Sequence, residues 1–215
     1  MGARVNASGS ERGAERRERV MEAALGVIAD RGLAATRISD IADRAGMSAG
    51  HVMYYFRSKD LVLMEALRFV EDRMHEEVGV ELASIAPGQK RLRRLLELNL
   101  PDGAADPGWA LWLEAWTLAS HDETVRVLVA ELEARWIELL TDVLRSGIDA
   151  GAFRCRAVEA AVTHIYATVN GLAVQVVTGA AGTTFDVALQ VCMRAAGSEL
   201  GFKVVRSRNH VSGGR

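Results

Sequence analysis

The sequence has few of the residues that build covalent or metal-centred sites. Only two cysteines occur in 215 residues, Cys155 and Cys192, and there is no C-x-x-C. A disulfide framework is therefore not expected, and the reducing cytoplasm is the simplest location. The five histidines never form an H-x-x-x-H pair, which argues against a zinc site. We expect no metal and no cofactor.

Motifs of enzymes and of membrane proteins are missing as well. No G-x-S-x-G, P-loop or G-x-G-x-x-G occurs, so nothing supports enzymatic chemistry. No uninterrupted apolar run approaches the roughly 20 residues that span a bilayer. The stretch 1–19, rich in Gly, Ser, Glu and Arg, lacks the apolar core of a secretory signal. We expect neither an enzyme nor a membrane partner.

Sustained alternation of apolar and polar residues, which would indicate strands, is also absent. Hydrophobic residues make up 49% and charged residues 25%, as is typical of a globular chain with a substantial core. Apolar residues recur at helical spacing, with breaks that contain Gly, Pro or Ser. These breaks lie near 87–88, 101–108, 120, 147–151 and 179–183. The pattern predicts an all-α fold of about nine helices.

The N-terminal part contains two short helices in close succession. The spacing predicts a helix over 11–30, then one from 36 or 37 to 45, and one over 49–56. Gly46 permits a tight turn between the short helices, and Ser48 offers a hydroxyl cap to the second of them. This arrangement is typical of a helix-turn-helix. Residues 1–60 also carry a small excess of positive charge, while the rest of the chain is net negative, which favours a nucleic-acid partner at the N-terminus.

A longer motif is more specific than the turn alone. Residues 36–61 read TRISDIADRAGMSAGHVMYYFRSKDL, and this string closely resembles the DNA-binding domain of the TetR family of regulators. The resemblance covers about residues 15 to 65. It implies a homodimer built on the last two long helices, and release from a double-stranded DNA operator when a small-molecule effector binds. The C-terminal part resembles the family only in the number and length of its helices.

The second helix of such a motif enters the major groove, and its N-terminal residues reach the base edges. Ala49 and Gly50 are small enough for close backbone approach, while the imidazole of His51 can donate to a purine N7 or to guanine O6. Tyr54 and Lys59 then lie toward the phosphates. The predicted DNA-binding residues are Arg37, Ser39, Ser48, Ala49, Gly50, His51, Tyr54, Tyr55 and Lys59.

Other interpretations of this region remain open at this point. A helix-turn-helix also occurs in proteins that never bind DNA. Tyr55 and Phe56 can be core aromatics, with Phe56 closing the small domain. The arginines that precede or open the first helix are either basic arms or solvated charges balanced by neighbouring glutamates. They are Arg4, Arg12, Arg16 and Arg17.

Three of the four tryptophans fall in one predicted helix after Gly108. Trp109, Trp112 and Trp116 are spaced i, i+3 and i+7, so they share one helix face. Such a face can wall an apolar ligand or cage a cation, with Glu114 as a counter-charge. It can equally be ordinary core packing.

The nearly apolar segment 162–177 contains a few polar side chains, among them Tyr166 and Asn170. These are either anchors of a pocket or hydrogen-bonding groups at a dimer interface. Gly171 beside Asn170 indicates close approach of another backbone and fits a helix–helix interface. The predicted ligand-binding residues are Trp109, Trp112, Trp116, Tyr166 and Asn170.

These features predict a ligand-responsive transcriptional regulator, in the first instance a repressor released from a pseudo-palindromic operator by a small molecule. The alternatives are an activator of the same fold and a helical interaction module with a vestigial helix-turn-helix. The predicted organisation is a flexible N-terminal extension (1–10), a helix-turn-helix DNA-binding domain (11–57), a helical ligand-binding and dimerisation domain (58–202) and a disordered tail (203–215).

Overall fold

The computed structural model describes residues 4–104 and 106–203, and the regular structure in these ranges is entirely helical. The all-α prediction and the count of nine α-helices are confirmed for this part of the chain. The helices are α1 (Arg4–Arg31), α2 (Ile38–Ala45), α3 (Ala49–Phe56), α4 (Lys59–Ala83), α5 (Gln89–Leu98), α6 (Pro107–Ala119), α7 (Glu123–Asp149), α8 (Val158–Thr178) and α9 (Phe185–Leu200), with a short 3₁₀ turn at Ala180–Gly182.

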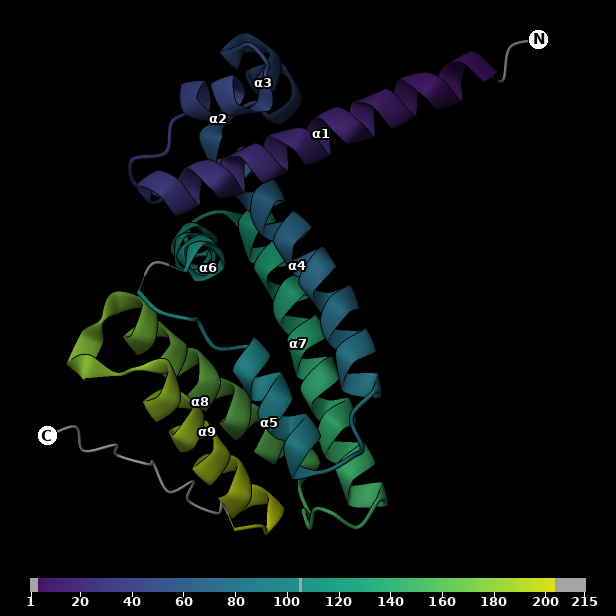
Figure 1. The fold of residues 1–215 in the computed structure, drawn as a ribbon, viewed down its shortest axis with the longest axis vertical. Coiled ribbons are helices and arrows are strands. Elements are labelled where there is room, and N and C mark those ends of the chain that lie inside the picture. Colours follow the sequence, from purple (N-terminus) through teal and green to yellow (C-terminus); the bar gives the residue numbers. More distant parts are fainter. Residues whose placement is uncertain (1–3, 105, 204–215) are drawn as a thin grey trace, which may run out of the picture.

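The helices form two ends joined by a pair of long helices (Figure 1). At one end α2 and α3 pack against α1, and at the other end α5, α8 and α9 lie together. The long helices α4 and α7 run side by side along the molecule. Helix α6 lies between the two ends and contacts α1, α4, α7 and α8. It therefore adds a further connection between the two ends, beside the long helices α4 and α7.

Some helix boundaries differ from those predicted. Helix α1 starts at Arg4 rather than at residue 11, so residues 4–10, which the sequence predicts as a flexible extension, are helical. Helix α6 starts at Pro107 because the Asp106 side chain caps it and proline is tolerated in the first turn. Of the predicted tail, 203–215, only Lys203 lies within the described residues.

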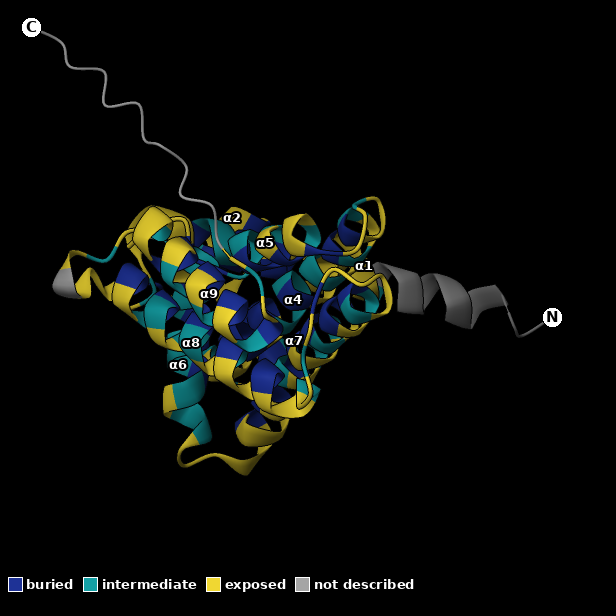
Figure 2. Cartoon of the chain, turned by 90° about the horizontal axis from the view of Figure 1, so that it is seen from below, coloured by how far each residue is buried: buried dark blue, intermediate teal, exposed yellow. Residues whose placement is uncertain are grey.

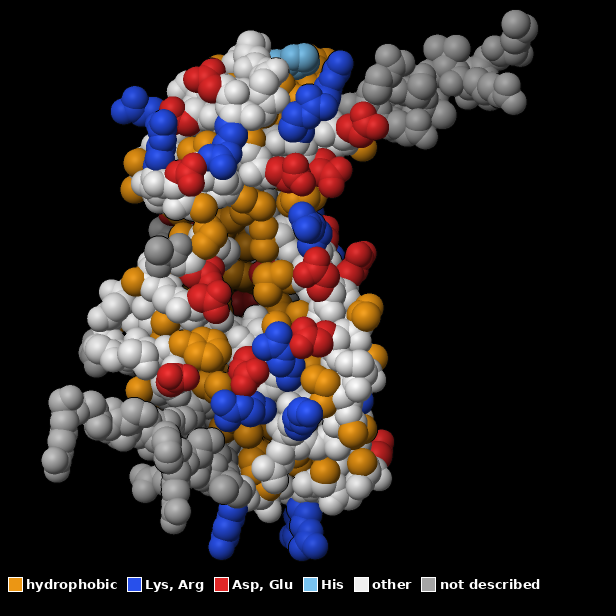
Figure 3. All heavy atoms as spheres, viewed as in Figure 1, with side chains coloured by type: hydrophobic (Ala, Val, Ile, Leu, Met, Phe, Trp, Pro, Cys, Tyr) orange, Lys and Arg blue, Asp and Glu red, His pale blue; other side chains and the backbone are white. Residues whose placement is uncertain are grey.

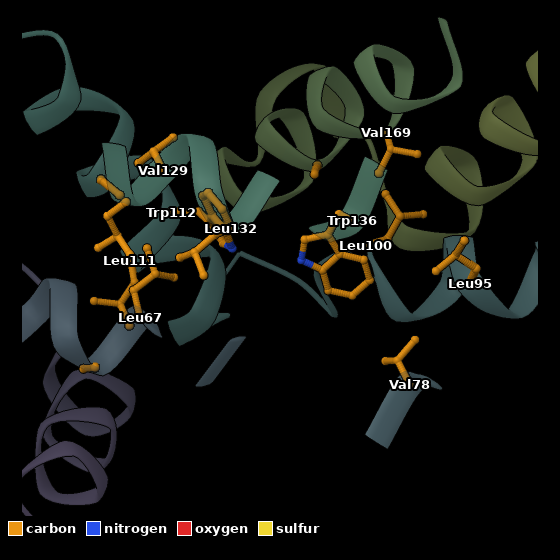
Figure 4. Close-up of a cluster of buried hydrophobic side chains, with 14 of the residues drawn as sticks. Leu67, Val78, Leu95, Leu100, Leu111, Trp112, Val129, Leu132, Trp136 and Val169 are labelled. Atoms are coloured by element: carbon orange, nitrogen blue, oxygen red, sulfur yellow. The ribbon is translucent and has the colours of Figure 1, made fainter. Parts of the chain in front are cut away.

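Burial follows one face of each helix (Figure 2). Leu63 and Leu67 of α4 and Leu132 and Leu144 of α7 are almost fully buried. Burying such a side chain contributes about 1.5 to 3 kcal/mol each. Leucine, valine and tryptophan side chains from several helices meet in this core (Figure 4). The pair α4–α7 thus forms a rigid support for both ends.

Helix α8 is long and apolar enough to cross a membrane by length and composition alone. In the structure it packs against α7 and α9. It buries Ile165, Val169 and Ala173, while Ala167 and Gly171 on another face stay exposed. The helix is therefore a core element of the C-terminal end with a second face turned outward.

Candidate functional site

The turn between α2 and α3 has the geometry that the sequence predicts. Gly46 adopts the left-handed conformation at φ 67°, which glycine reaches without steric cost. The Ser48 hydroxyl caps α3 by accepting a hydrogen bond from the backbone N–H of His51 at 3.2 Å. Buried Ile41 and Val52 join the two helices. This fixes the N-terminal end of α3 relative to the rest of the domain.

The residues predicted to bind DNA gather on one end of the molecule. We call this set, Arg37, Ser39, Ser48, Ala49, Gly50, His51, Tyr54, Tyr55 and Lys59, the reading surface. Seven of the nine are exposed, and only Tyr55 and Lys59 are half-buried. Tyr54 is the most prominent, with 79% of its surface exposed. Lysine and arginine side chains lie across the same end (Figure 3).

His51 is held in place by an aromatic neighbour. Its ring stacks on Tyr55 with centroids 5.5 Å apart and planes 17° from parallel, while Tyr54 meets the edge of Tyr55. Tyr55 in turn packs against the core. Phe56 is a core residue as predicted, only 2% exposed, and the Arg17 guanidinium lies over its ring. Arg17 therefore contributes to packing of α1 on α3.

Gly50 has no role inside the protein that would require glycine. It is helical without a positive φ, and a Cβ built there meets nothing within 4 Å. Neither backbone conformation nor packing explains the missing side chain. The free space lies on the exposed surface of α3, where close approach of another molecule would need it.

A cavity of about 550 Å³ lies between α4, α5, α6, α7 and α8. We call it the tryptophan cavity, because all four tryptophans of the chain line it: the predicted Trp109, Trp112 and Trp116 of α6, and Trp136 of α7. Tyr166 and Asn170 of α8 line it too, as do Glu71, Met74, Arg94, Glu97, Leu98, Asn99, Leu100, Asp102, Asp106, Gly108 and Phe185. The structure thus brings all five predicted ligand-binding residues together. Figure 3 shows this face hollowed at mid-height, with hydrophobic and acidic side chains at the hollow.

Glu71 of α4 is the buried charge of this cavity, with 5% of its surface exposed. Its Oε1 accepts a hydrogen bond from Trp112 Nε1 and its Oε2 one from Trp136 Nε1, both at 2.7 Å. The two indole nitrogens point into the same space from α6 and α7 (Figure 4). Among the ion pairs of the described residues, none involves Glu71. Burial raises the pKa of this carboxyl above its usual range.

Several other polar groups at the cavity walls are engaged with neighbouring side chains. Glu133 accepts a hydrogen bond from Trp116 Nε1 at 3.0 Å. Burial raises the pKa of Tyr166, and the neighbouring Asn170 side chain opposes this rise. Arg94 bonds Glu81 and Glu97. The aromatic rings touch one another, with Trp116 centroids 5.7 Å from Trp112 and 6.0 Å from Trp109. The walls are therefore mutually supported, and Glu71 is the buried carboxylate among them that forms no ion pair.

Glu114, the counter-charge that the sequence predicts, is in the wrong place for this role. It lies on another face of α6, in a groove shared with Lys59 of α4 and Leu33 of the α1–α2 loop. That groove does not belong to the tryptophan cavity. The buried carboxylate of the cavity is Glu71 and its fourth tryptophan is Trp136, neither of which was predicted.

Comparison with known proteins finds a family match for each half of the chain. Residues 20–66 match the family described as bacterial regulatory proteins, tetR family, and residues 87–201 match the C-terminal domain of BetI-type transcriptional repressors. The HTH-type transcriptional regulator BetI of Rhizobium meliloti (strain 1021) is 30% identical over 115 residues, which are 53% of this chain and 57% of that protein. The chain thus spans little more than half the length of that curated relative.

Solved structures match a larger share of this chain than the curated relative does. A transcriptional regulator from Saccharomonospora viridis in complex with choline is 34% identical, with a TM-score of 0.77 over 87% of this chain and 98% of that one. The regulator FadR from Bacillus subtilis in complex with stearoyl-CoA is 20% identical, with a TM-score of 0.68 over 85% of this chain and 98% of that one, a likeness of fold alone. A family match over more than half of the chain and a similar structure along nearly its whole length agree with the helix-turn-helix and the helical C-terminal end. The chain belongs to the TetR family of transcriptional regulators, which are not enzymes, and its C-terminal domain is of the BetI type.

Proposed function

We propose that this regulator is a cytoplasmic repressor that leaves its operator when a small quaternary ammonium compound such as choline binds in the tryptophan cavity. The observation that carries the proposal is the pairing of four tryptophans with Glu71, a buried carboxylate that forms no ion pair. Tryptophan faces attract cations, by about 2 kcal/mol or more when water is excluded. A carboxylate beside them supplies the balancing charge.

The choline complex of the Saccharomonospora viridis regulator supports this class of ligand, since that protein is 34% identical along nearly its whole length. Cavities for small ligands are usually apolar with a few convergent polar groups. The lining of this cavity also includes the acidic residues Glu97, Asp102 and Asp106, against the single cation Arg94. The overall charge favours a cation over an anion such as an acyl-CoA.

The reading surface is our proposed DNA contact. His51 and the small residues Ala49 and Gly50 would reach base edges, and Tyr54 and Lys59 would lie at the phosphates. Exposure of these side chains and the stacking of His51 on Tyr55 support the assignment. The side chains of the reading surface would then determine the sequence of the operator half-site.

A homodimer would place two reading surfaces on successive major grooves, about 34 to 36 Å apart. Helices α8 and α9 are the proposed interface. The outward face of α8 carries Ala167 and Gly171, and Val187 of α9 is an exposed apolar side chain. A Cβ at Gly171 would meet nothing within this chain, which leaves room for a partner backbone.

Helix α6 offers a route from the cavity to the reading surface. One face carries the three tryptophans, and another carries Leu113 and Thr117 toward the α1–α2 loop and the start of α4. Glu71, which binds Trp112, lies on α4 itself, and α4 begins at Lys59. Cation binding would therefore act on both helices that contact the DNA-binding end. A coupling of about 1 to 3 kcal/mol is sufficient for regulation.

Two titrations test the proposal. An operator selected from a randomised duplex pool is labelled, and its complex with the full-length protein is followed by anisotropy while choline is added. Tryptophan fluorescence of the free protein then reports on the cavity directly, because every tryptophan lines it. We expect a fluorescence change and release of DNA in the same choline range.

The uncharged carbon isostere of choline is the matched control ligand, because it has the same shape without the charge. It should bind much more weakly and release less DNA. If choline neither changes the fluorescence nor releases a selected operator, the proposed effector class is wrong. If no operator can be selected, the assignment of the reading surface is wrong.

A further inference from the structure

The ionised form of Glu71 is unfavourable when no cation is bound, because a buried carboxylate without a cationic partner is costly to ionise. We propose that the tryptophan cavity exchanges a proton for its cation: Glu71 is protonated in the ligand-free repressor and releases that proton when a quaternary ammonium group enters. The effector affinity would then depend on pH. This inference rests on the proposed function, since it concerns the same site and its cationic ligand.

The charged groups around Glu71 leave it uncompensated. They are Asp72 and His75 on its own helix, Arg94 and Glu97 on α5, Asp102 and Asp106 before α6, Glu133 and Arg135 on α7, and Tyr166 on α8. The arginines are engaged elsewhere: Arg94 with Glu81 and Glu97, and Arg135 with Asp72 and Glu131. The remaining charges at the cavity are mostly negative.

The hydrogen bonds of Glu71 are compatible with either protonation state. Each oxygen accepts one indole N–H and keeps a further lone pair, so a proton can be added without breaking the bonds to Trp112 and Trp136. Burial raises the pKa of Glu71, and the two indole hydrogen bonds together with Arg135 and His75 oppose this rise only in part. A cation in contact with the carboxylate would lower the pKa again.

Choline affinity should therefore rise with pH. At low pH a fixed-charge cation must displace the proton, so its affinity increases as the pH increases, by at most about tenfold per pH unit. Above the pKa of Glu71 in the ligand-free protein the affinity becomes constant. The uncharged carbon isostere of choline does not need the carboxylate ionised, so its affinity should not rise with pH.

Calorimetric titration of the full-length protein with choline chloride tests this without any variant. Titrations from about pH 5.5 to about pH 8, each in two buffers of different ionisation enthalpy, give the number of protons released per bound choline. We expect proton release to be greatest at the acidic end of this range and to fall toward zero at the basic end. Choline binding with equal affinity at every pH and no proton release would overturn the inference and leave the proposed function intact. Absence of binding at every pH would overturn both.

Two variants assign the proton to a residue. Glu71→Gln should abolish proton release, and its circular dichroism and operator affinity show whether it is folded. His75→Gln removes the imidazole that lies one turn further along the same helix, whose Nδ1 is buried without a partner and whose positively charged form would also repel a cation. Proton release that persists in His75→Gln supports Glu71 as the source. Release that is lost in His75→Gln but kept in Glu71→Gln overturns the assignment.

Discussion

The two ends of this regulator are built in opposite ways. The reading surface comes from residues 37–59, close together in the sequence, on two short helices, their N-caps and the first residue of α4, and its side chains are mostly small or exposed. The tryptophan cavity combines residues from Glu71 to Phe185, and its wall residues are mostly large and half-buried. A DNA-binding site can be specified by a short local motif, because the DNA already has a defined shape that the motif has to fit. A site that must enclose a small cation requires many helices.

The two ends also use charge differently. The reading surface presents polar groups to water, where interactions with phosphates weaken as salt rises. Glu71 lies out of water, so its attraction to a cation is strong and nearly insensitive to screening. Operator affinity should therefore fall steeply with salt while choline affinity changes little. Substitutions at either end should likewise alter one affinity and leave the other unchanged.

Glu71→Gln should have the largest effect, and only on the cavity. Removing one partner of a buried charge pair costs about 2 to 5 kcal/mol, so choline affinity should fall about 100-fold. Operator affinity without choline should be unchanged. Tryptophan fluorescence measures the first quantity and anisotropy the second. Glu114→Gln is the matched control, because Glu114 lies on the other side of α6. Equal losses in both variants would contradict the assignment of Glu71 as the counter-charge.

His51→Ala should affect only the reading surface. Removing a hydrogen bond to a base edge costs about 1 to 3 kcal/mol and relaxes specificity at one position of each half-site. Lys59→Ala should instead weaken binding to all sequences alike and reduce the salt slope by about 1 for each phosphate that the lysine neutralises. Selection from a randomised pool at two salt concentrations separates the two patterns. An unaltered preferred sequence in His51→Ala would show that this histidine does not contact the bases.

The turn between α2 and α3 was predictable because its signals are local. Gly46 and Ser48 lie at fixed positions in a turn, and the structure places both as predicted. The tryptophan face of α6 was predictable as well, since helical spacing alone puts Trp109, Trp112 and Trp116 together. Whether that face packs into the core or lines a cavity depends on the helices around it. Helical spacing does not contain this information.

The charge of the cavity was missed for the same reason. Glu114 is adjacent in sequence, yet helix geometry turns it away from the tryptophans, while Glu71 comes from a helix far along the chain. One signal for Glu71 was present: it follows Leu67 by four residues and precedes Met74 by three, so it occupies the apolar stripe of α4. A carboxylate in such a stripe needs partners, and two indole N–H groups provide them.

Leu113→Ala tests the link between the ends. Leu113 is half-buried on the α6 face that looks toward the α1–α2 loop and the start of α4. We expect choline affinity and operator affinity measured separately to stay close to wild type. The coupling free energy between choline binding and DNA binding should fall by about 0.5 to 2 kcal/mol. Choline should therefore release less DNA from this variant. Val127→Ala on the exposed side of α7 serves as the control. If choline released as much DNA from Leu113→Ala as from the wild-type protein, the coupling between cavity and reading surface would not run through α6.

The smallest change we propose, Gly50→Ala, should move stability and DNA affinity in opposite directions. A Cβ at Gly50 meets no protein atom within 4 Å, so the helix should gain up to about 1 kcal/mol from the better helix former. Operator affinity should fall, because the methyl group would stand between the α3 backbone and the groove. Gly79→Ala in α4 is equally free of contacts and should gain stability while binding DNA normally. Denaturant unfolding and anisotropy measure the two effects. If both variants bind DNA equally well, the α3 backbone does not approach the groove at residue 50, and the absence of a side chain there has no function in reading DNA.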